Sequence, residues 1–270
     1  MQKITDNIYT ETGFQGCNSS FIVTKEGAVV VDTPMVPAEA QEWKRQIEAH
    51  APVKYVIINE AHIDHYCGSC YLGGTVIGTE DTYTALKNAE MDELNGMLSM
   101  VAPSTPKPDL SFFFKPPEIT VEGEATLHLG DHTFKILSVP GHTPKQLAVY
   151  VPEERVVFTS DNINLEIPTF ISALPGEWIN SLNRLSELDV DYVIPGHGDI
   201  SDKNAFQVMK DKIQLWVEVV SGAIKDGLNS EETCKRIMGA KEFSDIPKEG
   251  PIAGFVNMNV DALYKSLSVE

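Results

Sequence analysis

The stretch NEAHIDH, residues 59–65, decides how the rest of this chain is interpreted. It follows directly on the apolar run 53–58 (VKYVII), whose β-branched residues and unbroken apolarity are typical of a buried parallel strand. The side chains with metal-binding atoms in this stretch are Glu60, His62, Asp64 and His65. If the stretch were extended, the first three would point the same way and His65 would turn to the other side. This short spacing with mixed direction suits two adjacent metal ions better than one.

Further candidate ligands each follow another apolar, strand-like run. They are His142 in SVPGHTP, Asp161 in VVFTSDN and His197 in YVIPGHG. Side chains delivered from several strand ends converge on one edge of a sheet, which is where α/β proteins usually form their sites. The sequence therefore predicts a two-metal centre built from distant parts of the chain.

The whole pattern resembles the metallo-β-lactamase fold superfamily, whose signature is His-x-His-x-Asp-His followed by distant His, Asp and His residues. The resemblance runs from Ile4 to about Gly198, and the supporting phrases VVVDTP, SVPGHTP, VVFTSD and YVIPGHG occur in the expected order. It implies an α/β fold of the four-layer αββα sandwich type, made of two similar halves with the metals at one edge. We expect a single such domain over residues 1–270, with a helical C-terminal part from about residue 201.

The same resemblance implies a role for each candidate ligand. The residues that would bind the first metal are His62 and His142, together with whatever occupies position 60. The residues that would bind the second metal are Asp64, His65 and His197. Asp161 would bridge the two metals, and Asp32 resembles a buried carboxylate of the family that orients the metal-binding loop by hydrogen bonds.

Glu60 departs from the family signature, because a histidine is usual at this position. A carboxylate is a competent metal ligand, so the site is retained. Three carboxylates and a hydroxide would balance two divalent cations, which weakens the metals as Lewis acids and favours harder ions such as manganese or iron. Zinc is the first expectation for a hydrolase, and a redox-active di-iron centre is the alternative that Glu60 raises. A further alternative is that Glu60 is a loop carboxylate that binds no metal.

The remaining sequence predicts alternating strands and helices. Strands are expected at KITDNIYTE, NSSFIVT, GAVVVD, TVIG, EITV, ATLHLG, HTFKILSV, QLAVYV, RVVFTS and YVI. Helices are expected from Pro37, over 80–100, over 177–188, from Ser201 or Asp202 to about Ile224, and from Ser230. The proline-rich segment 102–117 carries Phe112, Phe113 and Phe114, and we expect it to be a loop that could act as a lid.

The composition limits the classes of function. With 21 Lys and Arg residues against 39 Asp and Glu residues, the formal net charge is -18, which repels phosphate backbones and anionic lipid surfaces. We therefore expect no nucleic-acid or membrane partner. The sequence MQKITDNIYTE has no basic segment followed by an apolar core, and no run approaches the roughly 18 apolar residues of a membrane span. We expect a cytoplasmic protein that binds a small-molecule substrate, and a homodimer is left open.

Other conspicuous residues have simpler explanations. Cys67 and Cys70 form a CxxC immediately after the metal-binding stretch, but there is no second CxxC. Small residues packing at the start of a helix explain them adequately, and a redox or third-metal role is the alternative. The four cysteines of the chain are expected to stay reduced. The histidines outside the pattern, expected at the surface or in hairpins, are His50, His128 and His132.

The predicted site indicates a hydrolase. Two metals can hold a shared water, lower its pKa and polarise a neighbouring carbonyl oxygen. We expect a metal-bridging hydroxide, fixed by Asp64 and Asp161 as the catalytic residues, to attack a small ester, thioester or lactone. The residues expected to line the pocket are Asn162, Ile163, Asn164, Ile167 and Phe170. The alternatives are a di-iron oxidoreductase and a non-catalytic binding protein on the same scaffold.

Overall fold

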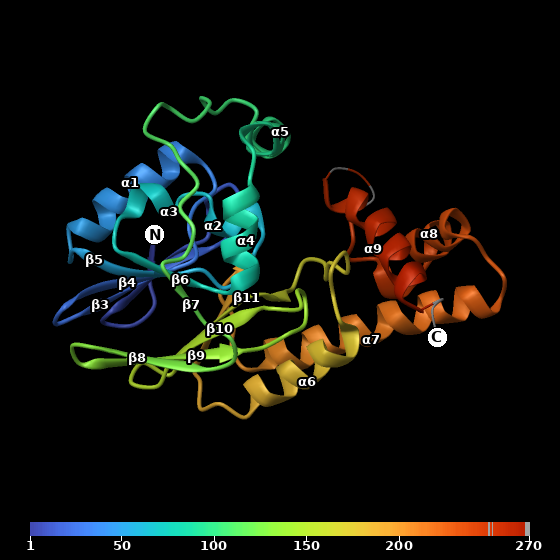
Figure 1. Cartoon of the computed structure of the whole chain (residues 1–270). Helices are drawn as coiled ribbons and strands as arrows, with labels where there is room; N and C mark the ends of the chain where they lie inside the picture. The colour runs from blue at the N-terminus through green and yellow to red at the C-terminus, as the bar shows by residue number, and fades with distance from the viewer. Residues whose placement is uncertain (248, 250, 268–270) are drawn as a thin grey trace.

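Two β-sheets pack face to face at the centre of the protein, and helices cover their outer faces (Figure 1). The computed structural model describes residues 1–247, 249 and 251–267. The first sheet has the strand order β1-β2-β3-β4-β5-β6-β7, and the second has the order β12-β11-β10-β9-β8. The αββα sandwich expected from the sequence is confirmed.

The first sheet is antiparallel in its first part and parallel from β4 onward. Its strands are β1 (Gln2–Lys3), β2 (Ile8–Glu11), β3 (Ser19–Thr24), β4 (Gly27–Val31), β5 (Val53–Ile57), β6 (Thr75–Gly78) and β7 (Ile119–Thr120). The parallel pairing of β4 with β5, joined through a helix, brings the carboxyl ends of both strands to one edge of the sheet.

The second sheet is antiparallel except for its last pair, in which β11 and β12 run parallel. Its strands are β8 (Ala125–Leu129), β9 (His132–Ser138), β10 (Leu147–Val151), β11 (Val156–Asn164) and β12 (Tyr192–His197). The carboxyl ends of β11 and β12 therefore meet at one edge of this sheet, as the prediction of converging ligands requires.

Helices cover each sheet on the side away from the other sheet. Those on the first sheet are α1 (Pro37–Glu48), α2 (Ile63–Tyr66), α3 (Ser69–Leu72), α4 (Glu80–Asn88) and α5 (Met91–Val101). Those of the second half are α6 (Pro175–Ser186), α7 (Asn204–Lys225), α8 (Ser230–Gly239), the 3₁₀ turn η1 (Lys241–Phe243) and α9 (Pro251–Leu267). Figure 1 shows α7, α8 and α9 extending beyond the edge of the sandwich.

Strand β4 shows how the sequence specifies this layering. Its residues are buried throughout. Val29 and Val31 join the core between the sheets, whereas Ala28 and Val30 join the cluster that includes Trp43 of α1. The side chains alternate between two covered faces, so the strand reads as an unbroken apolar run. The next residue, Asp32, is consequently placed at a buried strand end.

Two predicted elements are each divided in the structure. The segment KITDNIYTE forms β1 and β2 instead of one strand, because the Thr5 hydroxyl accepts hydrogen bonds from the backbone N–H groups of Asn7 and Ile8 and stabilises a turn. The expected helix 80–100 is interrupted at 89–90, where Ala89 has an extended backbone (φ -63, ψ 139). The interruption turns α5 across the end of α4 (Figure 1), with Leu94 and Leu98 buried against the first-sheet core.

The part of the chain after β12 is helical: α7 packs on β11 of the second sheet, and α8 and α9 pack on α7 and on each other. The capping residue of α8 is Asn229, whose side chain forms a capping box with Glu232, so this helix begins one residue after the cap at Ser230. Among the described residues, no helix is both long enough and apolar enough to cross a bilayer.

Candidate metal centre

Asp32 connects residues 59–65 to both sheets. Its Oδ1 accepts a hydrogen bond of 2.8 Å from the backbone N–H of Asn59, and its Oδ2 lies 3.2 Å from His65 Nδ1 and 3.0 Å from Ser160 Oγ. Asp32 and Ser160 both have positive φ angles, of 53° and 47°. Backbone strain of this kind persists only where the surrounding structure enforces it, and it concentrates at functional sites.

His65 presents one free nitrogen to a group of carboxylates. Its Nδ1 faces the carboxylate of Asp32, so Nδ1 carries a proton and Nε2 is the nitrogen left for a second proton or a metal ion. Nε2 is buried without a hydrogen-bond partner. It lies 3.5 Å from Asp161 Oδ1 and 3.7 Å from Asp64 Oδ2. A buried nitrogen that faces carboxylate oxygens needs a proton or a metal cation between them.

A first group of ligand atoms is formed by Glu60, His62 and His142. Glu60 Oε2 lies 2.5 Å from His62 Nδ1 and 3.4 Å from His142 Nε2, and the two imidazole nitrogens are 3.2 Å apart. Two atoms that bind one zinc ion tetrahedrally at 2.0–2.1 Å are separated by roughly 3.3 Å. The nitrogens of His62 and His142 already have that spacing. The 2.5 Å contact between Glu60 and His62 would have to lengthen if both bound one ion.

A second group is formed by Asp64, His65 and His197. His197 Nε2 lies 3.2 Å from Asp64 Oδ2. Asp64 and His65 both belong to α2, so the stretch turns into a helix after His62 and does not stay extended. The two neighbours still reach one group, because Asp64 Oδ2 and His65 Nε2 lie 3.7 Å apart.

Asp161 lies between the two groups. Its Oδ1 is 3.4 Å from His197 Nε2, and its Oδ2 is 3.7 Å from His142 Nε2. Glu60, His65 and Asp161 also form a third set of potential ligands that overlaps the other two. Asp161 Oδ1 is buried without a hydrogen-bond partner, as His65 Nε2 is. All seven predicted ligands therefore lie together, with spacings and unpaired atoms that fit two divalent cations.

The charges of the site compensate one another. Burial alone would raise the pKa of Glu60, but the nearby His65 and His142 hold it well below its ordinary value. Burial alone would lower the pKa of His197, but Asp161 and Asp64 raise it well above its ordinary value. In the chain alone, the raised pKa values of His62, His65 and His197 favour protons on these imidazoles, which offset the charge of the carboxylates. A divalent cation can take the place of such protons.

Two functional residues could not be identified from the sequence. The Ser160 hydroxyl lies 2.8 Å from Glu60 Oε1 and 3.0 Å from His65 Nδ1, and Gln146 Nε2 donates to Glu60 Oε1 at 3.3 Å. The backbone N–H of Asp161 donates to the same oxygen at 3.2 Å. Oε1 is therefore held by the protein, which leaves Oε2 facing the first group. The only signal in the sequence was the position of Ser160 beside Asp161.

Several residues singled out in the sequence lie outside the centre. The prediction that Ile163, Ile167 and Phe170 line the pocket is wrong, because these side chains are buried in the core beneath the C-terminal helices. Asn162 does reach the site, since its Oδ1 accepts a hydrogen bond from the backbone N–H of His142. Asn164 is buried in β11 and its side chain accepts from the backbone N–H of Glu166.

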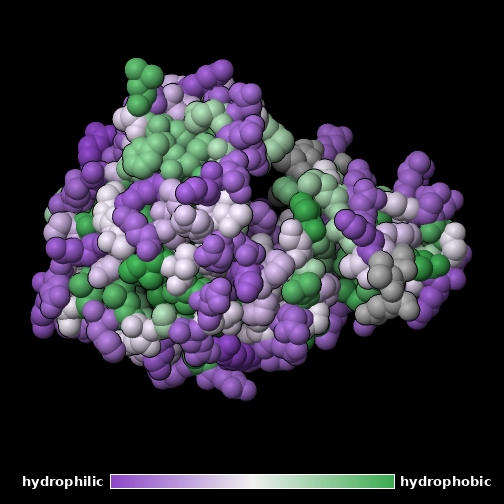
Figure 2. Space-filling view, in the orientation of Figure 1, coloured by the Kyte–Doolittle hydropathy of each residue, from purple (hydrophilic) through white to green (hydrophobic). Residues whose placement is uncertain are grey.

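The aromatic run and the CxxC have structural surroundings. Phe112 and Phe114 pack against the hydrophobic cluster between the first sheet and its helices, whereas Phe113 is 55% exposed. Figure 2 shows a hydrophobic area over α5 and the 102–117 loop, a region whose exposed apolar side chains include Met100 and Leu110. A role for Phe113 at the substrate stays a prediction.

The cysteines and remaining histidines differ in burial. Burial raises the pKa of the Cys67 thiol, and Cys70 is partly exposed; both are free thiols. His50 and His128 are exposed, as expected. His132 lies at the β8–β9 hairpin, which is one of the two positions expected for it. It is buried, because its ring is held by Asp131 and Glu154.

Comparison with known proteins identifies the family. A family model described as the metallo-beta-lactamase superfamily matches residues 12–197. The chain belongs to this superfamily. Superfamily members of known structure agree in fold. A metallo-beta-lactamase from Pontibacter korlensis superposes with a TM-score of 0.65 at 20% identity, over 79% of this chain and 97% of that chain. The DIM-1 metallo-beta-lactamase superposes with a TM-score of 0.62 at 21% identity, over 79% of this chain and 96% of that chain. At such identities these structures show the fold alone.

Relatives in sequence have several activities. A beta-lactamase-like protein 2 homolog of Caenorhabditis elegans is 25% identical over 76% of this chain, which spans 61% of that protein. The 2,4-dinitroanisole O-demethylase subunit alpha of a Nocardioides species is 24% identical, over 89% of this chain and 67% of that protein. Hydroxyacylglutathione hydrolase of Bartonella henselae is 34% identical over a shorter region, 34% of this chain and 32% of the enzyme. The superfamily match ends at residue 197, so α7, α8 and α9 lie beyond it.

Proposed function

We propose that this protein is a metal-dependent hydrolase that cleaves a small ester, thioester or lactone. The residues proposed to hold two divalent cations, zinc first and iron or manganese as alternatives, are Glu60, His62, Asp64, His65, His142, Asp161 and His197. Bound there, the cations would lower the pKa of a shared water and polarise the oxygen of the group under attack.

The unpaired atoms at the centre carry this proposal. His65 Nε2 and Asp161 Oδ1 are both buried, both lack a hydrogen-bond partner, and lie 3.5 Å from each other. Leaving such atoms unpaired costs about 1–3 kcal/mol each, a cost that a bound cation would remove. The strain at Asp32 and Ser160, which position these atoms, is a further cost that a ligand would offset.

The two proposed catalytic carboxylates have different surroundings. Asp161 is 7% exposed and lies between the two ligand groups, so it would orient the reacting water. The Asp64 side chain is 24% exposed and lies beside His197. Because Asp64 is the more accessible of the two, we propose that it passes the proton to the leaving group.

The relatives support hydrolysis without defining the substrate. Hydroxyacylglutathione hydrolase of Mesorhizobium japonicum is 27% identical over 56% of this chain, and the acyl group of such a substrate is joined to a thiol. The Nocardioides relative acts on an aryl methyl ether. A substrate panel should therefore contain a thioester, an ester, a lactone, a β-lactam and 2,4-dinitroanisole.

The test is hydrolysis of this panel by zinc-loaded protein, with the metal-stripped protein and a His197→Ala variant as controls. We expect the zinc-loaded protein to turn over at least one acyl substrate and the metal-stripped protein to turn over none. The rate of the variant should be lower by about 10³-fold or more, because the variant loses a ligand of the metals that activate the nucleophile. Rates for the loaded protein equal to those of the stripped protein across the whole panel would contradict the proposal.

A di-iron oxidoreductase is the second candidate, and Glu60 is the observation that favours it. Glu60 Oε2 faces His62 and His142 at ligand distances, which makes the centre richer in carboxylates than an all-histidine set and better suited to iron. Protein purified without added metal would then contain iron and consume oxygen with a reductant. Zinc as the purified metal, with no oxygen uptake after iron loading, would exclude this candidate.

We further propose one domain and a cytoplasmic location. The second-sheet core joins Val157 and Val193 of the strands to Cys234, Val256 and Val260 of the terminal helices, which is the continuity a single domain needs. The four cysteines are free, as expected of a reducing compartment. A homodimer stays a prediction that light scattering of the purified protein can test.

A further inference from the structure

Helix α9, which lies beyond the superfamily match, places a buried amide against the loop between β11 and α6. Asn259 has 0% exposure, and its neighbours on the helix, Val256 and Val260, belong to the hydrophobic core. Its Oδ1 accepts a hydrogen bond of 2.9 Å from the backbone N–H of Phe170, and its Nδ2 donates one of 2.6 Å to the carbonyl of Pro168. Both polar atoms of this side chain are thus committed to two residues of the loop.

The residue between those two contacts His142. The carbonyl oxygen of Thr169 lies 3.0 Å from His142 Nδ1, and the Thr169 hydroxyl lies 3.2 Å from the same nitrogen. A carbonyl oxygen can only accept, so Nδ1 carries the hydrogen and Nε2 keeps the lone pair. That Nε2 is the atom that lies 3.4 Å from Glu60 Oε2.

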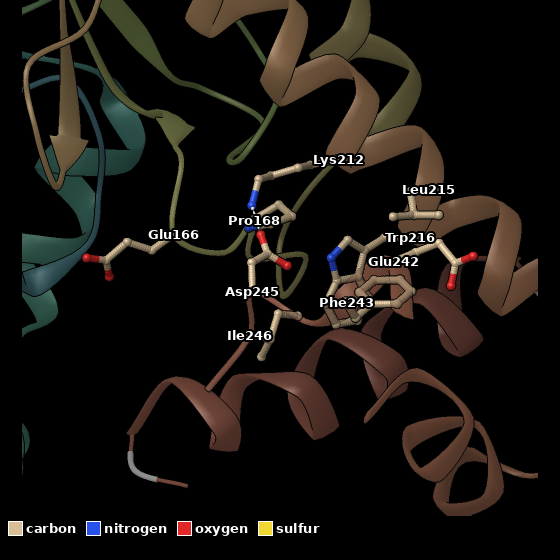
Figure 3. A pocket seen from close by; sticks show the side chains of 9 residues that line it. All are labelled: Glu166, Pro168, Lys212, Leu215, Trp216, Glu242, Phe243, Asp245 and Ile246. Carbon is tan, nitrogen blue, oxygen red and sulfur yellow. Dashed lines mark hydrogen bonds and ion pairs between the residues drawn. The ribbon is translucent and has the colours of Figure 1, made fainter. Parts of the chain in front are cut away.

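The opposite side of the loop is less firmly supported. Figure 3 shows Glu166 and Pro168 at the edge of a small cavity whose other walls come from α7 and the η1 region. The cavity has a volume of about 30 Å³, and an ion pair of 2.7 Å between Lys212 and Asp245 lies beside it. The cavity is about the size of one water molecule, so this side gives the loop little support. The two hydrogen bonds from Asn259 and the buried ring of Phe170 hold the loop from the other side.

We propose that Asn259 is a positioning residue for the metal centre. By holding both neighbours of Thr169, it fixes the Thr169 carbonyl, which fixes the tautomer and the ring orientation of His142. Hydrogen-bond partners of metal-binding histidines typically change metal affinity by 10–100-fold. Helix α9 would therefore help to position a ligand of the metal centre. The inference rests on the proposed function only in taking His142 as a metal ligand.

The test compares Asn259→Ala and Asn259→Asp with Val260→Ala, a truncation at the adjacent residue of α9 that is equally buried. Zinc affinity is measured by competition with a chromophoric chelator, and the His142 ring is observed by ¹⁵N NMR in zinc-loaded protein. We expect Asn259→Ala, which acts through Thr169, to weaken the binding of one of two zinc ions by about 10-fold, the lower end of the range for a direct partner, and to broaden or shift the His142 Nδ1–H signal. Asn259→Asp keeps the acceptor for Phe170 but sets a buried carboxylate oxygen against the carbonyl of Pro168, so it should weaken zinc binding at least as much.

Val260→Ala should lower the melting temperature without changing either zinc affinity or the His142 signal. Equal effects of Asn259→Ala and Val260→Ala on zinc affinity would overturn the inference. So would a wild-type His142 ring that carries its proton on Nε2, a result that needs no variant to fold. Because neither measurement uses a substrate, a wild type that binds zinc in this way and hydrolyses nothing would refute the proposed function and leave this inference intact.

Discussion

Replacing Ser160 by alanine would remove a hydroxyl group that contacts three residues of the candidate metal centre. Ser160 Oγ lies 2.8 Å from Glu60 Oε1, 3.0 Å from Asp32 Oδ2 and 3.0 Å from His65 Nδ1. Its single proton can serve only one carboxylate at a time, while its lone pair faces the imidazole. A hydrogen bond to a charged group contributes about 1.5–3 kcal/mol, so we expect Ser160→Ala to lower the free energy of unfolding by about 2 kcal/mol.

A glycine at the same position provides the matched control. Ser160 has a φ of 47°, a left-handed conformation that costs a residue with a Cβ about 1–2 kcal/mol and costs glycine little. Ser160→Gly loses the same hydrogen bonds but relieves this strain. Its free energy of unfolding should therefore be about 1 kcal/mol higher than that of Ser160→Ala. Denaturant unfolding of the metal-stripped proteins measures both differences.

Metal affinity then separates the role of the hydroxyl from the effect on folding. Both Ser160 variants should bind zinc about 10–100-fold more weakly than the wild type, since both lose the group that orients Glu60 and His65. Wild-type zinc affinity in the two variants, or equal unfolding free energies for wild type and Ser160→Ala, would refute this reasoning.

Two further predictions test the site and the junction of the sheets. In Gly196→Ala the added Cβ would overlap Asp161 Oδ1 and lie 2.7 Å from Asp161 N, so metal binding should fall sharply. The control is Gly222→Ala in α7, whose added Cβ meets no atom within 4 Å and should leave the metal content unchanged. Equal metal content in both variants would contradict the geometry. Burial tends to raise the pKa of Glu154, but hydrogen bonds, with that from Asn7 foremost, lower it below its ordinary value of 4.5. A lowered folded-state pKa stabilises the protein above the unfolded value, and this contribution is lost as the pH falls through the folded-state value. Glu154→Gln should therefore cost about 1 kcal/mol at pH 7 and progressively less below pH 4.5, as followed by urea unfolding at each pH; a cost independent of pH would contradict the assignment.

The fold could be predicted because its main signals are local. Apolar runs such as that of β4 identify buried strands, and each candidate ligand directly follows such a run. Parallel pairing of β4 with β5 and of β11 with β12 then places their ends together. The position of Glu60 in the motif was also sufficient to bring it into the candidate site.

The parts that could not be predicted depend on contacts between distant segments. Nothing in VVFTSD indicates that Ser160 adopts a left-handed conformation and reaches Asp32, because that conformation is imposed by the opposite sheet. Asn259 lies in an apolar helix whose pattern does not show that its amide meets a loop about 90 residues earlier. Phe170 follows the ligand-bearing strand, yet α7 and α9 bury it.

Metal content measured by elemental analysis, on zinc-loaded wild type and on His142→Ala and His197→Ala variants, tests the central claim most directly. The two histidines belong to different ligand groups, 142 to the first and 197 to the second. The account predicts two zinc ions per wild-type chain and one in each variant. A wild type that retains no zinc, or variants that both retain two ions, would contradict it.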